Sequence, residues 1–546
     1  MPETNDMTRY FTPIKTLSLA VILFAAAIVF PIATAQAQEM ANLDSQPKLI
    51  LTLDEAITVA LVENTALENI RLDQDFSDSQ IKEGWAELFP HVDFNSSYTR
   101  NVRSANPFAG SDAGGLFETL GFLNWISFNE QARTDNDAGS NPISIGEYFQ
   151  RVQQGYTNAG IVPNTSSNPF SVPNVYNNGL SIVQKVFDGR AIFGAYGASK
   201  WLKPFNEYAV SREEHRLINQ VKTAWFRILL LKEQENVLAQ SVSRSGRTLD
   251  EVSRQVTQGV APKFQRLSAE VELANLETQL VQAQTNSAAA LDNLKILLSV
   301  PSEYEVEVRG TLEGSMDGSM VATSLEDAAL IALEKRPDLA QSRISIELER
   351  IQLQVAKVEF LPTLDAFANF NYLGNVPDSR SVISSSAADP FSFSESNRGY
   401  FDTAYWDRST NVGFRLKWNL FNGFASRQHV QQRKIAIQKA ENNSEFLART
   451  IRVEVEQSLR NLRAAQTRML SQQQNVERAE LNFEYAESRL KEGVATPLEV
   501  RETSNQLDQS KLGYLQAVHD FLVARSAYQT AIGDPGNYSA DSPDGN

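Results

Sequence analysis

The chain contains two copies of one segment, and this duplication constrains the fold more than any other feature. The sequence over residues 53–61 recurs over residues 325–333, at an offset of 272 residues. Further along, Gly259-Val-Ala recurs as Gly493-Val-Ala, at an offset of 234 residues, and the surrounding block keeps that register. A register that stays fixed over so long a stretch predicts two tandem copies of one structural unit.

The two copies set most of the domain boundaries. The first repeat spans residues 52–299, the connection spans 300–323, and the second repeat spans 324–533. The drop in offset means that the first copy carries 38 more residues between its blocks, in a loop at 101–178, whereas the second copy has a shorter loop at 374–410. The first loop is rich in Asn, Ser, Gly and Phe, a composition typical of exposed loops, so both are expected to be extracellular.

The two ends of the chain are expected to lie outside the repeats. An apolar run over residues 16–37 follows a basic head and ends in small residues at A-x-A spacing. This pattern predicts a signal peptide over residues 1–37, with an uncleaved membrane anchor as the alternative. Residues 38–51 would then form an N-terminal segment, and residues 534–546 a disordered tail.

Composition excludes several classes of protein. With 50 basic and 66 acidic residues, the net charge of -16 argues against nucleic-acid binding, which needs a basic surface. The mean hydropathy of -0.31 argues against a multi-helix membrane protein. There are no cysteines, which excludes disulfides and a lipid-bearing cysteine. The four histidines lack metal-ligand spacing and no catalytic or phosphate-binding motif is present, so we predict no metal, no cofactor and no enzyme.

Each copy contains two segments that alternate as strands do. In the last of these segments Phe414, Leu416 and Trp418 alternate with Arg415 and Lys417. A run of about 10 residues with this period suits a membrane-spanning strand with lipid on one face and water on the other, and a soluble β-sandwich is the alternative. Four strands cannot close a barrel, and an open edge in hydrocarbon leaves unpaired backbone groups, so several chains would share one barrel.

Long helices are predicted after the second strand of each copy. Apolar residues step alternately by four and three over residues 217–256 and again over 451–490. A period of 3.5 residues indicates helices that wrap as coiled coils. A helix over residues 190–258 would be roughly 100 Å long, and a second helix returns after Gly259 and after Gly493. The period alone leaves open whether these helices form a stalk or a tube.

Several short motifs occur in the same order in both copies. These are the [TS]-L-x-x-A-x-x-x-A-L segments, the Phe-Asp-Gly and Phe-Asn-Gly strand endings and the Gly-Val-Ala turns. Together, over Thr52 to Gly533, they resemble the TolC family of outer-membrane efflux proteins. The resemblance implies a mixed α/β membrane protein in which a homotrimer builds a 12-stranded outer-membrane β-barrel, with four strands per chain, continued by a long periplasmic α-helical barrel. It also implies docking to a periplasmic adaptor protein and an inner-membrane transporter, without catalysis or cofactor.

The predicted function is therefore an exit duct in the outer membrane. It would export small molecules or proteins passively, within a tripartite efflux system or a type I secretion system. The alternative is a trimeric coiled-coil surface protein with a structural or adhesive role. That alternative predicts one strand block near a terminus and no duplication, whereas this sequence has two blocks in two copies.

The turn of the second copy carries the candidate constriction. In the family that this chain resembles, acidic residues six and nine positions after the turn glycine Gly493 line the periplasmic constriction, and here those residues are Glu499 and Glu502. Rings of carboxylates favour the passage of cations. The alternative for Glu499 is a capping box with Thr496.

The chain also departs from the family's gate. The resemblance places an acidic residue where Gln265 stands and a basic residue where Ala495 stands. Closure is therefore expected to depend on apolar side chains, namely Leu490, Val494 and Leu498.

The two hairpin tips are candidates for contact with the adaptor. The resemblance places that contact near the turns, and the alternative is that the glycines serve only the backbone of the turn. The tip residues are Gly259, Val260 and Ala261 in the first copy and Gly493, Val494 and Ala495 in the second.

Overall fold

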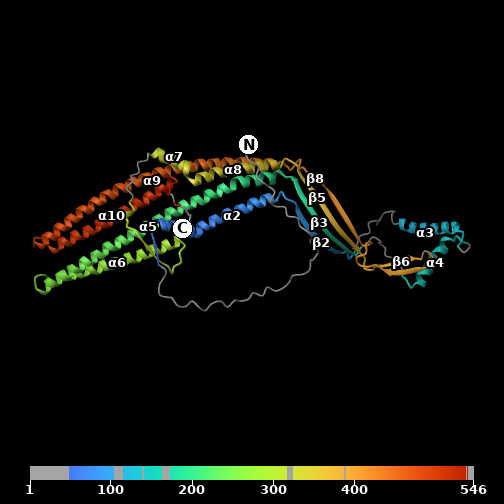
Figure 1. Cartoon of the computed structure of the whole chain (residues 1–546), viewed down its shortest axis with the longest axis horizontal. Helices are drawn as coiled ribbons and strands as arrows, with labels where there is room; N and C mark the ends of the chain where they lie inside the picture. Colours follow the sequence, from blue (N-terminus) through green and yellow to red (C-terminus); the bar gives the residue numbers. More distant parts are fainter. Residues whose placement is uncertain are drawn as a thin grey trace, which may run out of the picture.

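The computed structural model describes residues 48–103, 115–137, 140–162, 172–316, 324–386, 389–492, 494–536 and 538. The molecule is elongated, with long helices at one end, a tilted sheet beyond them, and a small helical subdomain at the far end (Figure 1). The signal peptide expected over residues 1–37 lies outside the described residues.

The two repeats fold in the same order. In the first repeat the elements are α1 (Leu53–Glu63), α2 (Thr65–Ala86), β2 (His91–Arg100), β3 (Asn174–Phe187), α5 (Gly189–Thr257) and α6 (Lys263–Leu297). In the second they are α7 (Leu325–Lys335), α8 (Pro337–Val358), β5 (Thr363–Val376), β8 (Trp406–Lys417), α9 (Ala425–Lys491) and α10 (Pro497–Ala531). The short helices keep the offset of 272 residues and the returning helices that of 234, so the predicted duplication is confirmed.

The short helices start where the repeated motif supplies a cap. At α1 the Thr52 hydroxyl accepts a hydrogen bond from Glu55 N, and the Glu55 carboxylate accepts one from Thr52 N at 2.7 Å. At α7 the Ser324 hydroxyl accepts from Asp327 N at 3.1 Å. A side-chain oxygen at this position satisfies an N–H group that has no partner within the helix. The Thr or Ser that opens each motif is therefore explained by helix capping.

The long helices follow the predicted seams. Helix α5 has 69 residues and α9 has 67, which corresponds to roughly 100 Å each. Every residue of both predicted rows is buried or half-buried, as Leu217, Ile228, Ile451 and Leu462 illustrate. Helix α5 packs on α6 and α9 on α10, and α5 also packs on α10. The two hairpins therefore lie side by side along one direction (Figure 1).

The four longest strands form one antiparallel sheet in the order β2-β3-β5-β8. Its register places Phe94 opposite Leu180, and Leu180 opposite Phe370. Among the described residues, β2 and β8 each pair on one side only. One detail of the prediction is wrong: β8 ends at Lys417, so Trp418 lies after the strand, where its indole N–H donates to the Phe360 carbonyl at 3.1 Å.

The two long loops contain secondary structure that the sequence analysis did not anticipate. The first contains α3 (Gly115–Thr134) and α4 (Ile145–Asn158), and the second contains the hairpin of β6 (Ser381–Ser385) and β7 (Phe393–Asn397). Aromatic contacts join them: the ring centroids of Phe128 and Phe391 lie 5.2 Å apart, and those of Tyr156 and Phe393 lie 4.2 Å apart. The described parts of these loops thus pack into the subdomain at the far end of Figure 1.

A second small sheet lies beside the helices. Strand β1 (Lys48–Leu51) pairs in parallel with β4 (Glu305–Val308), so the segment before the first repeat contacts the inter-repeat connection. Both strands contribute to the main core, together with Trp225 and Leu522. None of the helices in the described part of the chain is long and apolar enough to cross a membrane.

A polar side chain closes the same junction in each repeat. In the first, Asn64 Nδ2 donates to the Leu297 carbonyl at the end of α6, at 2.8 Å. At the matching position of the second, Arg336 Nη1 donates to the Ala531 carbonyl at the end of α10, at 3.3 Å. Both bonds satisfy carbonyl groups that a helix end leaves without a partner. The returning helix of each hairpin is thereby tied to the turn between the two short helices.

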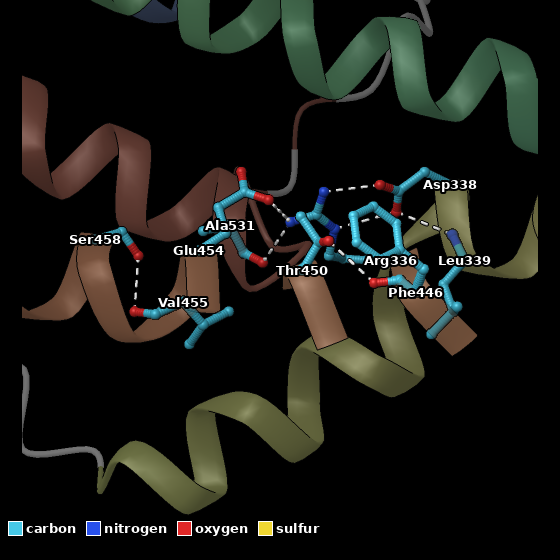
Figure 2. Close-up of polar contacts among 9 residues, drawn as sticks. All are labelled: Arg336, Asp338, Leu339, Phe446, Thr450, Glu454, Val455, Ser458 and Ala531. Carbon is cyan, nitrogen blue, oxygen red and sulfur yellow. Dashed lines mark hydrogen bonds and ion pairs between the residues drawn. The ribbon is translucent and has the colours of Figure 1, made fainter. Parts of the chain in front are cut away.

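Arg336 also forms the most buried ion network of the described residues (Figure 2). Its Nε and Nη2 donate to the two carboxylate oxygens of Asp338 at 3.1 and 2.7 Å, and its Nη1 donates to Glu454 at 2.7 Å. Burial alone would lower the pKa of the guanidinium, but the hydrogen bonds and charges of Asp338 and Glu454 raise it above its usual value. Arg336 therefore stays charged and joins α8, α9 and α10.

The residues after α10 are in contact with the body of the protein. The sequence analysis assigned residues 534–546 to a disordered tail. Asp534 forms an ion pair with Lys335 at 2.7 Å, and Tyr538 packs against the main core. Residues 539–546 lie outside the described residues.

Candidate functional site

One face of the four-stranded sheet is apolar and exposed. Because side chains alternate along a strand and the register is known, the same face carries apolar residues from all four strands. Val412 and Phe414 on β8 are 73% and 74% exposed. The other exposed apolar residues of this face are Val92, Phe94, Leu180, Phe370 and Leu416. A soluble β-sandwich would bury these side chains against a second sheet, so the exposure argues against that alternative.

The opposite face of the sheet is polar. Asp93, Ser181, Asn369 and Asn411 lie in one row across the four strands. Within this row the Ser181 hydroxyl donates to Asn369 Oδ1 at 2.8 Å, and Asn369 Nδ2 donates to Asn411 Oδ1 at 2.8 Å. Amide and hydroxyl side chains that bond one another across strands suit a face in contact with water. An apolar face and a polar face on one sheet are typical of the wall of a membrane barrel.

Aromatic residues bracket the apolar face at both ends. At the end toward the small subdomain, the Trp406 ring lies 5.5 Å from Tyr176 and 5.0 Å from Tyr372. At the end toward the helices, Trp418 and Phe421 are exposed. The 12 residues of β8 between these groups span about 40 Å, or about 30 Å of membrane thickness at a tilt near 45°. The sequence analysis missed these two belts, although the positions of Trp406 and Trp418 around one strand would have indicated them.

The two hairpin tips share one backbone geometry. Val260 N donates to the Gln255 carbonyl at 3.0 Å, and Val494 N donates to the Arg489 carbonyl at 2.9 Å in the second tip. Gly259 has a φ of +74°, a left-handed conformation in which a side chain would be strained. The glycine at this position is therefore required by the turn itself.

The tip residues differ in exposure. Gly259, Val260, Val494 and Leu498 are exposed, whereas Ala261, Leu490 and Ala495 are half-buried. Gly493 lies outside the described residues. The tips form the end of the molecule that is farthest from the sheet (Figure 1).

The two acidic candidates of the second tip have different surroundings. Glu499 N donates to the Thr496 hydroxyl at 3.2 Å, so Thr496 caps α10. The Glu499 carboxylate, however, pairs across the turn with Arg489 rather than completing a capping box. Glu502 is exposed and forms no ion pair with any described residue. The uncompensated negative charge of this tip therefore lies at Glu502.

A polar cluster that the sequence did not reveal links the two hairpins. Arg244 on α5 forms an ion pair with Asp508 on α10, and the Ser241 hydroxyl donates to Asp508 at 2.6 Å. Arg244 Nε also donates to the Ser504 hydroxyl at 3.3 Å. Both charged side chains are largely buried. This cluster holds the first hairpin against the second on the tip side of the main core.

Titratable residues of the helical part show no arrangement for catalysis. Burial lowers the pKa of His215 and of His519 below the usual value, so both rings are neutral at pH 7. Across the ranges that the structure describes, no three His, Asp or Glu side chains converge to hold a metal ion.

Comparison with known proteins identifies the family. The family model described as "Outer membrane efflux protein" matches residues 147–299 and 330–534, which is more than half of the chain. The chain belongs to the outer membrane efflux protein family. This family consists of outer-membrane channel proteins rather than enzymes, so the chain is an outer-membrane efflux channel and not a coiled-coil adhesin or stalk.

Individual relatives agree with this assignment. The outer membrane protein TolC of Escherichia coli strain K12 is 22% identical over 371 residues, which cover 66% of this chain and 70% of that protein. The pyoverdine export outer membrane protein OpmQ of Pseudomonas aeruginosa is 23% identical over 305 residues, covering 55% of this chain and 58% of the relative. The Campylobacter jejuni CmeC outer membrane channel has the same fold, with a TM-score of 0.64 and 15% identity over 89% of this chain and 86% of that one. The predicted family and fold class are confirmed.

Proposed function

We propose that three copies of this chain form one exit duct, through which an inner-membrane transporter and a periplasmic adaptor protein export small molecules or proteins. The observation that carries this proposal is the four-stranded sheet with an apolar face, a polar face and two unpaired edges. Unpaired N–H and C=O groups cost several kcal/mol each in hydrocarbon, so β2 and β8 need partners. Pairing β8 of one copy with β2 of the next closes a barrel of twelve strands when three copies meet.

The long hairpins would continue this barrel in the periplasm as a tube. Their buried seams leave other apolar side chains exposed in the single chain, among them Phe264, Leu267 and Val271 on α6. These three residues follow the spacing of a helical stripe, which suits packing against a neighbouring copy. The loops at 101–178 and 374–410 would then face the exterior, and the signal peptide at 1–37 would be removed during export. No catalytic step is required, because the energy would come from the transporter.

The tips would provide both the constriction and the adaptor contact. Leu490, Val494 and Leu498 supply apolar side chains at the end of the second hairpin, and Glu502 supplies one free carboxylate per copy. Three such carboxylates around an axis would attract cations and repel anions. The exposed Val260 and Val494 would contact the adaptor.

Capture of the native assembly tests the proposal. Crosslinking in intact cells, followed by purification through a tag on this chain, is expected to recover one adaptor and one inner-membrane transporter. Deleting the gene is expected to abolish export of that transporter's substrate. Recovery of neither partner, with export unchanged, would reject the proposed function.

The free charge of the tip gives a specific expectation for ion selectivity. In planar bilayers, Glu502→Gln is expected to reduce the preference for cations, because it removes one carboxylate from each copy. The readout is the reversal potential in a salt gradient. Glu326→Gln, which removes the same charge from α7, serves as the control and should leave the reversal potential unchanged. An equal effect of both substitutions would place the selectivity elsewhere.

A further inference from the structure

A polar cavity with a volume of about 640 Å³ lies away from both the strand wall and the tips. Its walls come from α1, α5, α10, the segment at 309–316 and the residues after α10. Three of the residues that line it are cationic, namely Lys222, Arg309 and Arg525, and only one, Asp54, is acidic. The charge of the lining therefore favours an anion.

Lys222 is the least exposed of these charged residues, at 7%. Its ammonium group donates to the Pro535 carbonyl at 2.6 Å and to Gln529 Oε1 at 3.4 Å, and it lies 5.1 Å from the centroid of the Tyr538 ring. These partners are neutral, and no carboxylate of the described residues lies within ion-pair distance of Lys222. A buried ammonium group without a counter-ion is unfavourable, since neutral acceptors replace only part of its hydration.

The second repeat shows that this lysine is not needed to build the fold. The matching position on α9 is Glu456, which forms an ion pair with Arg460 of the same helix. Two helices with the same role thus carry opposite charges at this site. A residue that the repeated architecture does not require, and whose burial is costly, indicates a local purpose.

The cavity has the groups to hold a small organic molecule. Trp225 and Phe226 provide apolar wall, and Ser526 and Gln529 provide hydrogen-bonding groups near Lys222. We propose that this cavity binds a small organic anion, whose carboxylate or phosphate group accepts a hydrogen bond from Lys222 Nζ. Such a site joins α1, α5, α10 and the chain end, and it is independent of the duct and of the proposed partners.

Calorimetric titration of the purified full-length protein tests this proposal with two probes. Succinate represents carboxylates and inorganic phosphate represents phosphates, each measured against sodium chloride at the same ionic strength. Binding of at least one probe is expected for the unmodified protein, and the probe that binds identifies the acidic group. Lys222→Met is expected to weaken that binding about tenfold or more, because it removes a charge-assisted hydrogen bond. Lys232→Met, which changes a lysine of the same helix that lies outside the cavity, should bind as the unmodified protein does.

The pH dependence of succinate binding gives a second test that needs no variant. Burial, followed by the charge of Arg525, lowers the pKa of Lys222 to about 8, against the opposing charges of Asp54 and Asp534. Lys222 is therefore protonated below that pH, and succinate binding should weaken as the pH rises above about 8 toward 10. The other groups that face Lys222 are carboxylates, guanidinium groups and the Tyr538 phenol, whose pKa burial raises, so the lysine dominates this change. Failure of both probes to bind, or equal binding by Lys222→Met, would overturn the proposal.

Discussion

Replacing Arg336 with alanine is expected to lower the free energy of unfolding by about 3 kcal/mol. The side chain of Arg336 is 14% exposed and that of its partner Asp338 is 18% exposed, so solvent screens this pair only weakly. The substitution would leave the Asp338 carboxylate without a counter-ion and the Ala531 carbonyl without its donor. Urea unfolding of the detergent-solubilised protein, followed by circular dichroism, measures the change.

Arg343→Ala provides the matched control for this experiment. Arg343 lies on the same helix, is exposed, and makes only one long hydrogen bond, of 3.5 Å, to the Leu333 carbonyl. Its loss is expected to change the free energy of unfolding by less than about 0.5 kcal/mol. If the two alanine variants unfolded at the same urea concentration, the junction around Arg336 would not stabilise the protein as described.

Val412→Arg is expected to destabilise the inserted sheet by about 2–4 kcal/mol per chain. Val412 lies near the middle of β8 on the exposed apolar face, where a charged side chain would have to enter hydrocarbon. The expected result is a large loss of folded protein from the outer membrane. Urea titration of the protein in lipid vesicles gives the free energy directly.

The control places the same residue on the other face of the same strand. Ser409 lies three positions earlier, and the strand period directs it to the polar face. Ser409→Arg is expected to insert and fold normally, because that face would line a water-filled lumen. Equal destabilisation by both arginines would contradict the assignment of the two faces.

Elements with a regular period could be predicted from the sequence. The step of three and four residues on α9 places Ile451, Val455 and Leu462 on one buried stripe, since a helix seam depends only on spacing along one element. The boundaries of the short helices were also predictable, because Thr52 and Ser324 are caps that act on their own helix. The duplication then doubled the information for each of these elements.

Features that depend on contacts between distant segments could not be predicted in this way. The pairing of β1 with β4 and the bond of Arg244 to Asp508 join residues that no local pattern relates. Helices α3 and α4 lie in a loop whose polar composition hid them. Their fold depends on rings such as Phe391, which belongs to the other repeat.

The candidate site was predictable in position but not in detail. The repeat placed Glu499 and Glu502 in the first turns of α10, as the structure does. The alternatives for Glu499 were a cap and a constriction, and neither included its ion pair with Arg489. A salt bridge across a turn depends on side-chain conformations that spacing cannot fix.

The number of chains in the folded particle tests the central claim most directly. Native mass spectrometry of the protein, released from detergent micelles, is expected to give a mass of three chains, since four strands per chain then make a closed barrel of twelve. A stable particle of one or two chains, with its sheet intact, would leave the edges of β2 and β8 unpaired in the membrane and would contradict the shared barrel.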